Sequence, residues 1–353
     1  MKPTYFLLSL IASLVMFSCN QPSDYITNNN VKYIKDFPAN KTFDHASPID
    51  IDLRGVVNFF IAGEHIYLQH LSGNRFWSVY SINDKKHVVD LLDKGSSRLE
   101  FTDLPSCEDI YEIDSVLYCN VKKPSESKIM QINLTESILE KKTVIKELAN
   151  FDNVSGFISN CFQINDTSFF ISNSRDYKSV KRFALENNKR VNLKQCEYLN
   201  TPVINEDMNT LSAIRTYNRS QNMVAEGMLR LNQINVYSLD KDNSYVICVG
   251  DELSDYLDVD RTSKRQLKKY YGHIYSNDKY YALLYHNKPL KSYLDYNSES
   301  YIQFFSWEGA PLSEIKFTFP VTAFSVKGND LYVLSLNKDG EEVLYNYNIQ
   351  ELL

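Results

Sequence analysis

A short motif that recurs about every fifty residues constrains this 353-residue chain more than any other feature. The motif is a strand, a polar turn and a second strand rich in apolar and aromatic residues. Its anchor residues are separated by 51, 51, 111 and 52 positions, and the long interval spans two periods with a missing copy near Val224. The sequence therefore contains six copies, of which the other five are anchored at Tyr67, Tyr118, Phe169, Tyr280 and Tyr332.

Each copy continues into further strands, and their number predicts the architecture. A third strand follows the anchor by 13 to 15 residues, except in the fifth copy, where an insertion at residues 287–299 delays it. A fourth strand follows in every copy but the last. Six copies of four strands, each spanning about 40 to 55 residues, predict an all-β, six-bladed β-propeller of four-stranded blades. A pair of β-sandwiches is the alternative, which the regular interval disfavours.

The sixth copy ends at Leu353 without a fourth strand. A propeller has to close its ring, because an open sheet edge invites aggregation. We therefore expect an N-terminal strand, within residues 31–37 or 48–53, to complete the sixth blade.

The first thirty residues read as a targeting segment. Lys2 precedes an apolar run over residues 5–17, which is too short for a membrane span of about 20 residues and is typical of a signal peptide. The run ends at Ser18-Cys19, which resembles the cleavage box of bacterial lipoproteins. We expect residues 1–18 to be a lipoprotein signal peptide, Cys19 the lipidation site, residues 19–30 a flexible tether and residues 31–353 a single propeller domain. A plain secretory signal is the alternative.

Four stretches of the chain carry a resemblance to a known family, and they lie at residues 91–105, 211–226, 270–288 and 301–335. In these stretches the chain is similar to the TolB-like six-bladed β-propeller lipoproteins of Gram-negative bacteria. The first stretch keeps only Lys94-Gly95 and Glu100-Phe101 of a fuller glycine-rich pattern that such proteins carry there. The resemblance extends over nearly all of the mature chain and implies a propeller anchored by lipid. It implies no catalytic residues.

The composition excludes several function classes. The closest glycines are Gly55 and Gly63, so the chain contains neither the GxGxxG pattern nor a P-loop, which need closely spaced glycines to hold phosphates. A formal charge of −6 argues against a nucleic-acid partner. No metal site is predicted either, because the six His residues form no HExxH motif and no CxxC occurs. We expect no cofactor.

Five cysteines follow Cys19, namely Cys107, Cys119, Cys161, Cys196 and Cys248. For the nearest pair, a turn at Asp114-Ser115 would place Cys119 opposite Ile110. Cys107 would then lie about three residues away along the strand, beyond the reach of a disulfide. We expect Cys119 and Cys248 to be small core residues.

One place offers candidate ligand-binding side chains. His273 and His286 flank a hairpin in the fifth copy, and Tyr293 and Tyr296 lie in its insertion, where aromatic rings can stack on sugars or peptides. We predict a ligand rim from these four residues, and no catalytic or metal-binding residue. The charged segment at residues 251–269 is predicted to be a surface loop or a helix.

These features favour a non-catalytic lipoprotein of the cell envelope, anchored to the outer membrane, that binds or scaffolds a protein, peptide or glycan. The alternative is a propeller hydrolase or lyase that acts on an envelope or extracellular glycan through carboxylates or His at the central channel. A third hypothesis is a structural subunit of an envelope complex. Fold alone does not decide among them.

Overall fold

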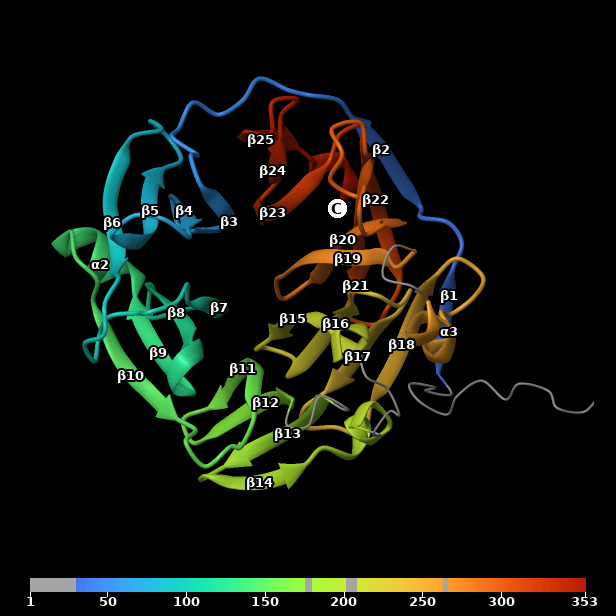
Figure 1. Ribbon diagram of the computed structural model, residues 1–353, viewed down its shortest axis with the longest axis horizontal. Helices are drawn as coiled ribbons and strands as arrows, with labels where there is room; N and C mark the ends of the chain where they lie inside the picture. The colour runs from blue at the N-terminus through green and yellow to red at the C-terminus, as the bar shows by residue number, and fades with distance from the viewer. Residues whose placement is uncertain (1–29, 175–179, 201–207, 263–265) are drawn as a thin grey trace, which may run out of the picture.

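Six β-sheets are arranged like blades around a central channel in the computed structural model, which describes residues 30–174, 180–200, 208–262 and 266–353. Figure 1 shows the ring face-on, with the chain passing once around it from blade to blade. The predicted fold class, an all-β six-bladed propeller, is confirmed. Cys19, the predicted signal peptide and all of the predicted tether except Asn30 lie outside the described residues.

The first three blades each contain four antiparallel strands, numbered from the channel outward. Blade 1 comprises β3 (Val56–Ala62), β4 (His65–His70), β5 (Arg75–Ser81) and β6 (His87–Asp93). Blade 2 comprises β7 (Ser106–Ile113), β8 (Val116–Lys123), β9 (Lys128–Asn133) and β10 (Ile145–Asn150). Blade 3 comprises β11 (Phe157–Asn165), β12 (Ser168–Ser174), β13 (Val180–Glu186) and β14 (Lys189–Asn192).

Blades 4 and 5 also contain four antiparallel strands that are consecutive in the sequence. Blade 4 comprises β15 (Ala213–Asn218), β16 (Met223–Met228), β17 (Ile234–Ser238) and β18 (Ser244–Val249). Blade 5 comprises β19 (Lys268–Ser276), β20 (Tyr280–Pro289), β21 (Ser300–Ser306) and β22 (Pro311–Phe317). In the described part of the chain, blade 6 has three strands, β23 (Val321–Lys327), β24 (Asp330–Leu336) and β25 (Glu342–Asn348).

The repeat seen in the sequence maps onto this architecture. All six anchor residues lie in the second strand of their blade, in β4, β8, β12, β16, β20 and β24. The predicted turn at Asp114-Ser115 is present, and both residues have positive φ, as a tight hairpin turn requires. The insertion of the fifth copy lies between β20 and β21.

The N-terminal strands do not complete the sixth blade, which corrects the expected ring closure. Strand β1 (Val31–Ile34) pairs in parallel with β18 at the outer edge of blade 4, and β2 (Ala39–Phe43) pairs in parallel with β22 at the outer edge of blade 5. The chain then crosses the outer edge of blade 6, where the Ile49 amide donates to the Leu344 carbonyl at 2.8 Å. The segment contacts this blade without forming a strand.

Side-chain packing between blades closes the ring instead. The core consists of six hydrophobic clusters, one between each pair of neighbouring blades. The cluster between blades 6 and 1 joins Leu334 and Leu344 to Ile66 and Leu68, and Leu53 of the N-terminal segment packs against them. Burial of apolar side chains therefore links the last blade to the first without a shared sheet.

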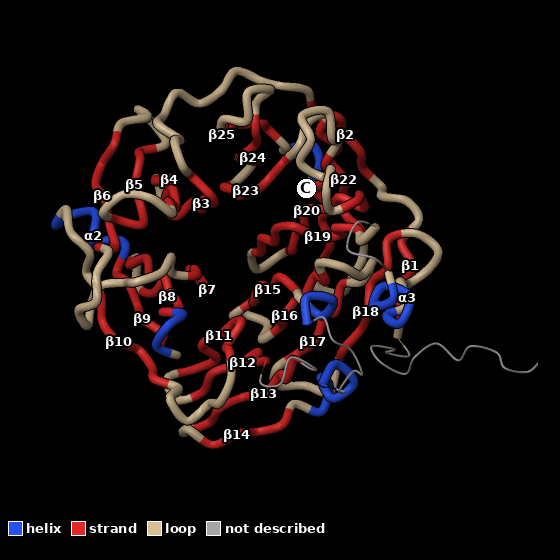
Figure 2. Tube along the Cα trace, viewed as in Figure 1, coloured by secondary structure: helices blue, strands red, loops and turns tan. Residues whose placement is uncertain are grey.

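The few helices lie outside the blades (Figure 2). Helix α2 (Leu134–Glu140) follows β9 and is capped by Asn133, whose side chain accepts from the Glu136 amide at 3.0 Å. Helix α3 (Tyr256–Arg261) lies in the charged segment between blades 4 and 5. Short 3₁₀ turns are found at Pro124–Glu126, Lys194–Asn200, Met208–Leu211 and Gln350–Leu352. None of the described helices is long and apolar enough to cross a membrane.

Candidate functional site

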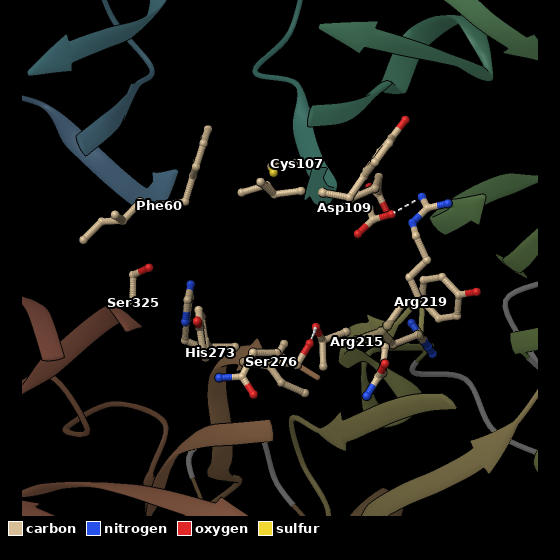
Figure 3. A pocket seen from close by; sticks show the side chains of 18 of the residues that line it. Phe60, Cys107, Asp109, Arg215, Arg219, His273, Ser276 and Ser325 are labelled. Atoms are coloured by element: carbon tan, nitrogen blue, oxygen red, sulfur yellow. Dashed lines mark hydrogen bonds and ion pairs between the residues drawn. The ribbon is translucent and has the colours of Figure 1, made fainter. Parts of the chain in front are cut away.

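The central channel holds a cavity of about 740 Å³. Its walls come from the innermost strands of five blades, β3, β7, β15, β19 and β23, and from the turns after β15 and β19. Figure 3 shows side chains from these strands projecting toward the same space. Residues more than two hundred positions apart in the sequence therefore face one another, as is usual where a ring of blades surrounds an axis.

An ion pair spans one wall of the cavity from blade 2 to blade 4. Nη2 of Arg219 lies 2.5 Å from Oδ2 of Asp109, and the guanidinium lies 4.1 Å from the centre of the Tyr111 ring (Figure 3). The side chain of Asp109 is 8% exposed and that of Arg219 is 32% exposed. Burial raises the pKa of Asp109 above its ordinary value, although the positive charge of Arg219 opposes this. Arg219 thus presents a partly open cationic surface to the channel.

Behind this wall lies a buried cluster of charges between blades 3 and 4. Glu226 accepts from Nε of Arg182 and from Nε of Arg215, each at 2.8 Å, and from the Tyr237 hydroxyl at 3.1 Å. Burial alone would raise the pKa of Glu226, but the charges and hydrogen bonds of Arg182 and Arg215 lower it to about 2. Arg215 also reaches Asn160 of β11 at 2.9 Å, which links this cluster to the channel wall.

A second buried carboxylate, Glu108, lies next to Asp109 on β7. It accepts from the Cys161 amide at 3.0 Å and lies 3.8 Å from Nζ of Lys122. The ion pairs in and behind this wall involve four cations, Lys122, Arg182, Arg215 and Arg219, and three carboxylates, Glu108, Asp109 and Glu226. The cavity lining itself includes two arginines, Arg215 and Arg219, and four carboxylates, Glu108, Asp109, Glu112 and Asp278.

Several lining residues have unsatisfied polar atoms. A buried polar atom costs about 1–3 kcal/mol when it lacks a hydrogen bond, so a group of such atoms marks a place that a ligand or water can stabilise. In the described part of the chain, six residues that line the cavity have one buried side-chain nitrogen or oxygen without a partner: Asn58, Gln69, Glu108, Arg215, Arg219 and His273.

The four residues predicted to form a ligand rim are not brought together. His273 lines the central cavity, where its ring lies edge-on to Phe324 at 5.2 Å and burial lowers its pKa to about 4, so the imidazole is neutral at pH 7. His286 is buried on β20 against Tyr293, with ring centres 5.0 Å apart. Tyr296 is stacked on His45 at 5.8 Å, away from both. Of the four side chains, the structure thus brings together only His286 and Tyr293.

Apart from His273, the charged and polar residues of the channel wall were missed by sequence reasoning. Asp109, Tyr111, Arg215 and Arg219 lie in or beside the first strands of the second and fourth copies. A signal was present: Arg215 and Arg219 lie within residues 211–226, one of the four stretches singled out in the sequence. Charged side chains on a strand that alternation assigns to the interior could have indicated a channel. Among the described residues, no three His, Cys, Asp or Glu side chains are grouped to hold a metal ion.

Comparisons with known proteins support the fold. The chain matches no protein-family model. It also matches no curated protein. It is similar to the crystal structure of a DUF4221 family member from Bacteroides vulgatus, with a TM-score of 0.52 and 12% identity over 85% of this chain and 96% of that one. A luciferin-regenerating enzyme aligns with a TM-score of 0.44 and 10% identity over 83% of this chain and 91% of that one, and we draw nothing from it. At these identities the likeness shows the fold alone.

Proposed function

We propose that this protein is a lipoprotein of the cell envelope, TolB-like in architecture, whose propeller binds an acidic ligand in its central channel without chemically altering it. The ligand is a peptide or glycan, or an exposed segment of an envelope protein, that presents a carboxylate. One observation carries the proposal: a cavity of about 740 Å³ is bordered by Arg219, whose guanidinium lies over the Tyr111 ring and is partly open to the channel.

The partly exposed guanidinium of Arg219 favours an acidic group at this point of the wall. The low-dielectric surroundings strengthen charge–charge interactions, and an arginine can hold a carboxylate with two parallel hydrogen bonds. Tyr111 lies under the guanidinium of Arg219 and holds its plane in place. Tyr111, Tyr217 and Tyr275 also line the cavity and add aromatic surface for a sugar ring or an apolar side chain.

Thermal-shift and calorimetric titrations with paired probes test the binding role. The probes are galacturonic acid against galactose, and an acetylated dipeptide acid against its amide. We expect an acidic probe to bind more tightly than its neutral partner, and we expect this preference to be lost in Arg219→Gln. Arg54→Gln is the matched control, because Arg54 is highly exposed and its nearest ion-pair partner, Asp52, is two residues away. Equal binding of acidic and neutral probes, or a preference that survives Arg219→Gln, would refute the proposal.

The membrane anchor is tested separately. Metabolic labelling with a fatty acid should modify the wild-type chain and not Cys19→Ala, because a lipidated cysteine holds the protein at the membrane through its buried chain. Equal labelling of both would end the lipoprotein interpretation and would leave the channel proposal standing.

A second candidate function, a hydrolase or lyase acting on a glycan, rests on the presence of two titratable groups in the lining of one cavity. Asp109 has a raised pKa, and His273 is neutral at pH 7, so the channel holds a candidate acid and a candidate base. Incubation of the protein with acidic oligosaccharides, followed by analysis of reducing ends and unsaturated products, distinguishes the two functions. Product that forms with the wild type and not with Asp109→Asn would favour the enzyme.

A further inference from the structure

Two thiols meet beside the central cavity. Cys107 on β7 is half-buried and lines the cavity, and Cys119 on the neighbouring strand β8 is fully buried. Their Sγ atoms are 3.2 Å apart, and both residues are free thiols in the structure. The other described cysteines, Cys161, Cys196 and Cys248, are each buried, and none of them has a thiol contact of this kind.

An irregularity in strand pairing brings the two thiols together. Cys119 lies opposite Ile110, as the sequence predicts, but the register of β7 and β8 shifts between Cys107 and Asp109. Because of this bulge, Cys107 lies opposite Val121, two residues from Cys119 along β8, so both side chains point to the same face of the sheet. The expectation that the pair is out of disulfide reach was therefore wrong, since it assumed a regular ladder.

We propose that Cys107 and Cys119 form an intramolecular disulfide in the native protein, a modification that ties β7 to β8 at the wall of the channel. The oxidant is the disulfide of an envelope thiol oxidoreductase, so the proposal rests on the envelope location proposed above. An S–S bond of about 2.05 Å requires the sulfurs to approach further, which rotation about the side-chain torsions provides.

The chemistry proceeds by thiol–disulfide exchange. The Cys107 thiolate attacks one sulfur of the oxidant, which forms a mixed disulfide and releases one thiolate of the oxidant. The Cys119 sulfur, having lost its proton, then attacks the Cys107 sulfur and releases the second thiolate. Two thiols of this chain are oxidised, one disulfide of the oxidant is reduced to two thiols, and the two protons end on those thiols. Cys107 is the first nucleophile because it borders the cavity, whereas burial raises the pKa of the Cys119 thiol.

The bond would also fix the part of the wall that carries the charges. Glu108 and Asp109 follow Cys107 directly at the bulge, and Asp109 holds Arg219. Oxidation would therefore hold the bulge, and with it the position of Asp109, against local opening of β7.

The test uses the purified full chain and glutathione disulfide, followed by alkylation in denaturant and peptide mapping. We expect a peptide that joins Cys107 to Cys119, with Cys161, Cys196 and Cys248 fully alkylated. The cross-link should be absent from Cys107→Ser and kept in the control Cys161→Ser, while Cys119→Ser should retain glutathione on Cys107. Wild-type protein that stops at the glutathione adduct, or that is alkylated at all five thiols, would overturn the proposal.

The same mapping on protein alkylated in intact cells tests the native state. A joined peptide supports the proposal, and reduced thiols at both positions overturn it. Fatty-acid labelling of Cys19 in the same cells separates the two proposals: a labelled chain with reduced thiols refutes the disulfide and retains the envelope location. An unlabelled chain with reduced thiols refutes both the anchor and the disulfide.

Discussion

Replacing Glu226 with glutamine should destabilise the ring more than any other isosteric change of a charged residue described above. Glu226 has no exposed side-chain surface and neutralises Arg182 and Arg215, each 2% exposed. Glutamine keeps the volume of the side chain and removes its charge. Two guanidinium groups would then remain buried between blades 3 and 4 without a carboxylate.

Two independent arguments give the magnitude. Removing one partner of a buried ion pair costs about 3–5 kcal/mol, because an uncompensated charge is left behind. A pKa lowered from 4.5 to about 2 corresponds to about 3 kcal/mol of stabilisation of the charged form. Because this pKa is lowered on folding, the stabilisation is complete above pH 4.5 and is lost as the pH falls toward 2. We expect Glu226→Gln to lower the free energy of unfolding by about 3–5 kcal/mol at pH 7.

Urea unfolding followed by circular dichroism measures this loss. With an m-value near 3 kcal/mol/M, the midpoint should fall by about 1 M or more at unchanged slope. The control is Glu299→Gln, since Glu299 pairs with Lys316 at 2.8 Å while both side chains are more than one-third exposed, and such a pair contributes less than about 1 kcal/mol. A midpoint that shifts no more in Glu226→Gln than in the control would refute the argument.

Three further changes have defined outcomes. Burial lowers the pKa of His273 from 6.5 to about 4, so the free energy of unfolding is unaffected by this group above pH 6.5 and falls by about 3 kcal/mol toward pH 4. The free energy of unfolding should therefore change less with pH over this window in His273→Gln than in the wild type. Identical pH curves for the two proteins would contradict the argument. A Cβ at Gly227 would lie 2.4 Å from Cδ2 of the buried Leu283, so Gly227→Ala should lower the free energy of unfolding by about 1–3 kcal/mol. Adding Leu283→Ala to the same chain should recover part of this loss. Wild-type stability of the single variant Gly227→Ala would count against this packing. Asn133→Ala removes the cap of α2 and should lower the free energy of unfolding by about 1 kcal/mol, whereas Asn133→Asp should lower it little. Equal losses for the two variants in thermal unfolding would show that the cap is not the cause.

The fold was accessible from the sequence because its signal is local and repeated. Each anchor, from Tyr67 to Tyr332, lies in a second strand, and the turn at Asp114-Ser115 needed only neighbouring residues to be recognised. Alternation of apolar and polar residues identifies a strand without regard to its partner.

The pairing of strands that are distant in the chain could not be predicted from the sequence in the same way. The sequence of β1 indicates a strand, but nothing in it specifies parallel pairing with β18 rather than a place in blade 6. The bulge between Cys107 and Asp109 is likewise a property of the paired strands. A shift of one residue in strand pairing changes which side chains share a face of the sheet. Here it places the thiols of Cys107 and Cys119 on the same face.

The channel site depends on which blades the closed ring brings close to one another. Asp109 and Arg219 are 110 residues apart and meet only because the ring places blades 2 and 4 on either side of blade 3. The placement of the residues predicted to form a ligand rim also depends on the fold. His273 and His286 are close in sequence, but they lie on adjacent strands of one blade, where one faces the channel and the other is buried against Tyr293.

The N-terminal segment has a topological consequence for the integrity of the ring. Because the antiparallel strands of every blade are consecutive in the sequence, no sheet contains both the beginning and the end of the chain. The segment from β1 to Leu53 instead follows the circumference past blades 4, 5 and 6 before it enters blade 1. A single peptide-bond cleavage between β2 and β3 would therefore leave all six sheets intact and remove the covalent tie across the seam between blades 6 and 1. The ring would then stay closed there only by the apolar contacts of that seam.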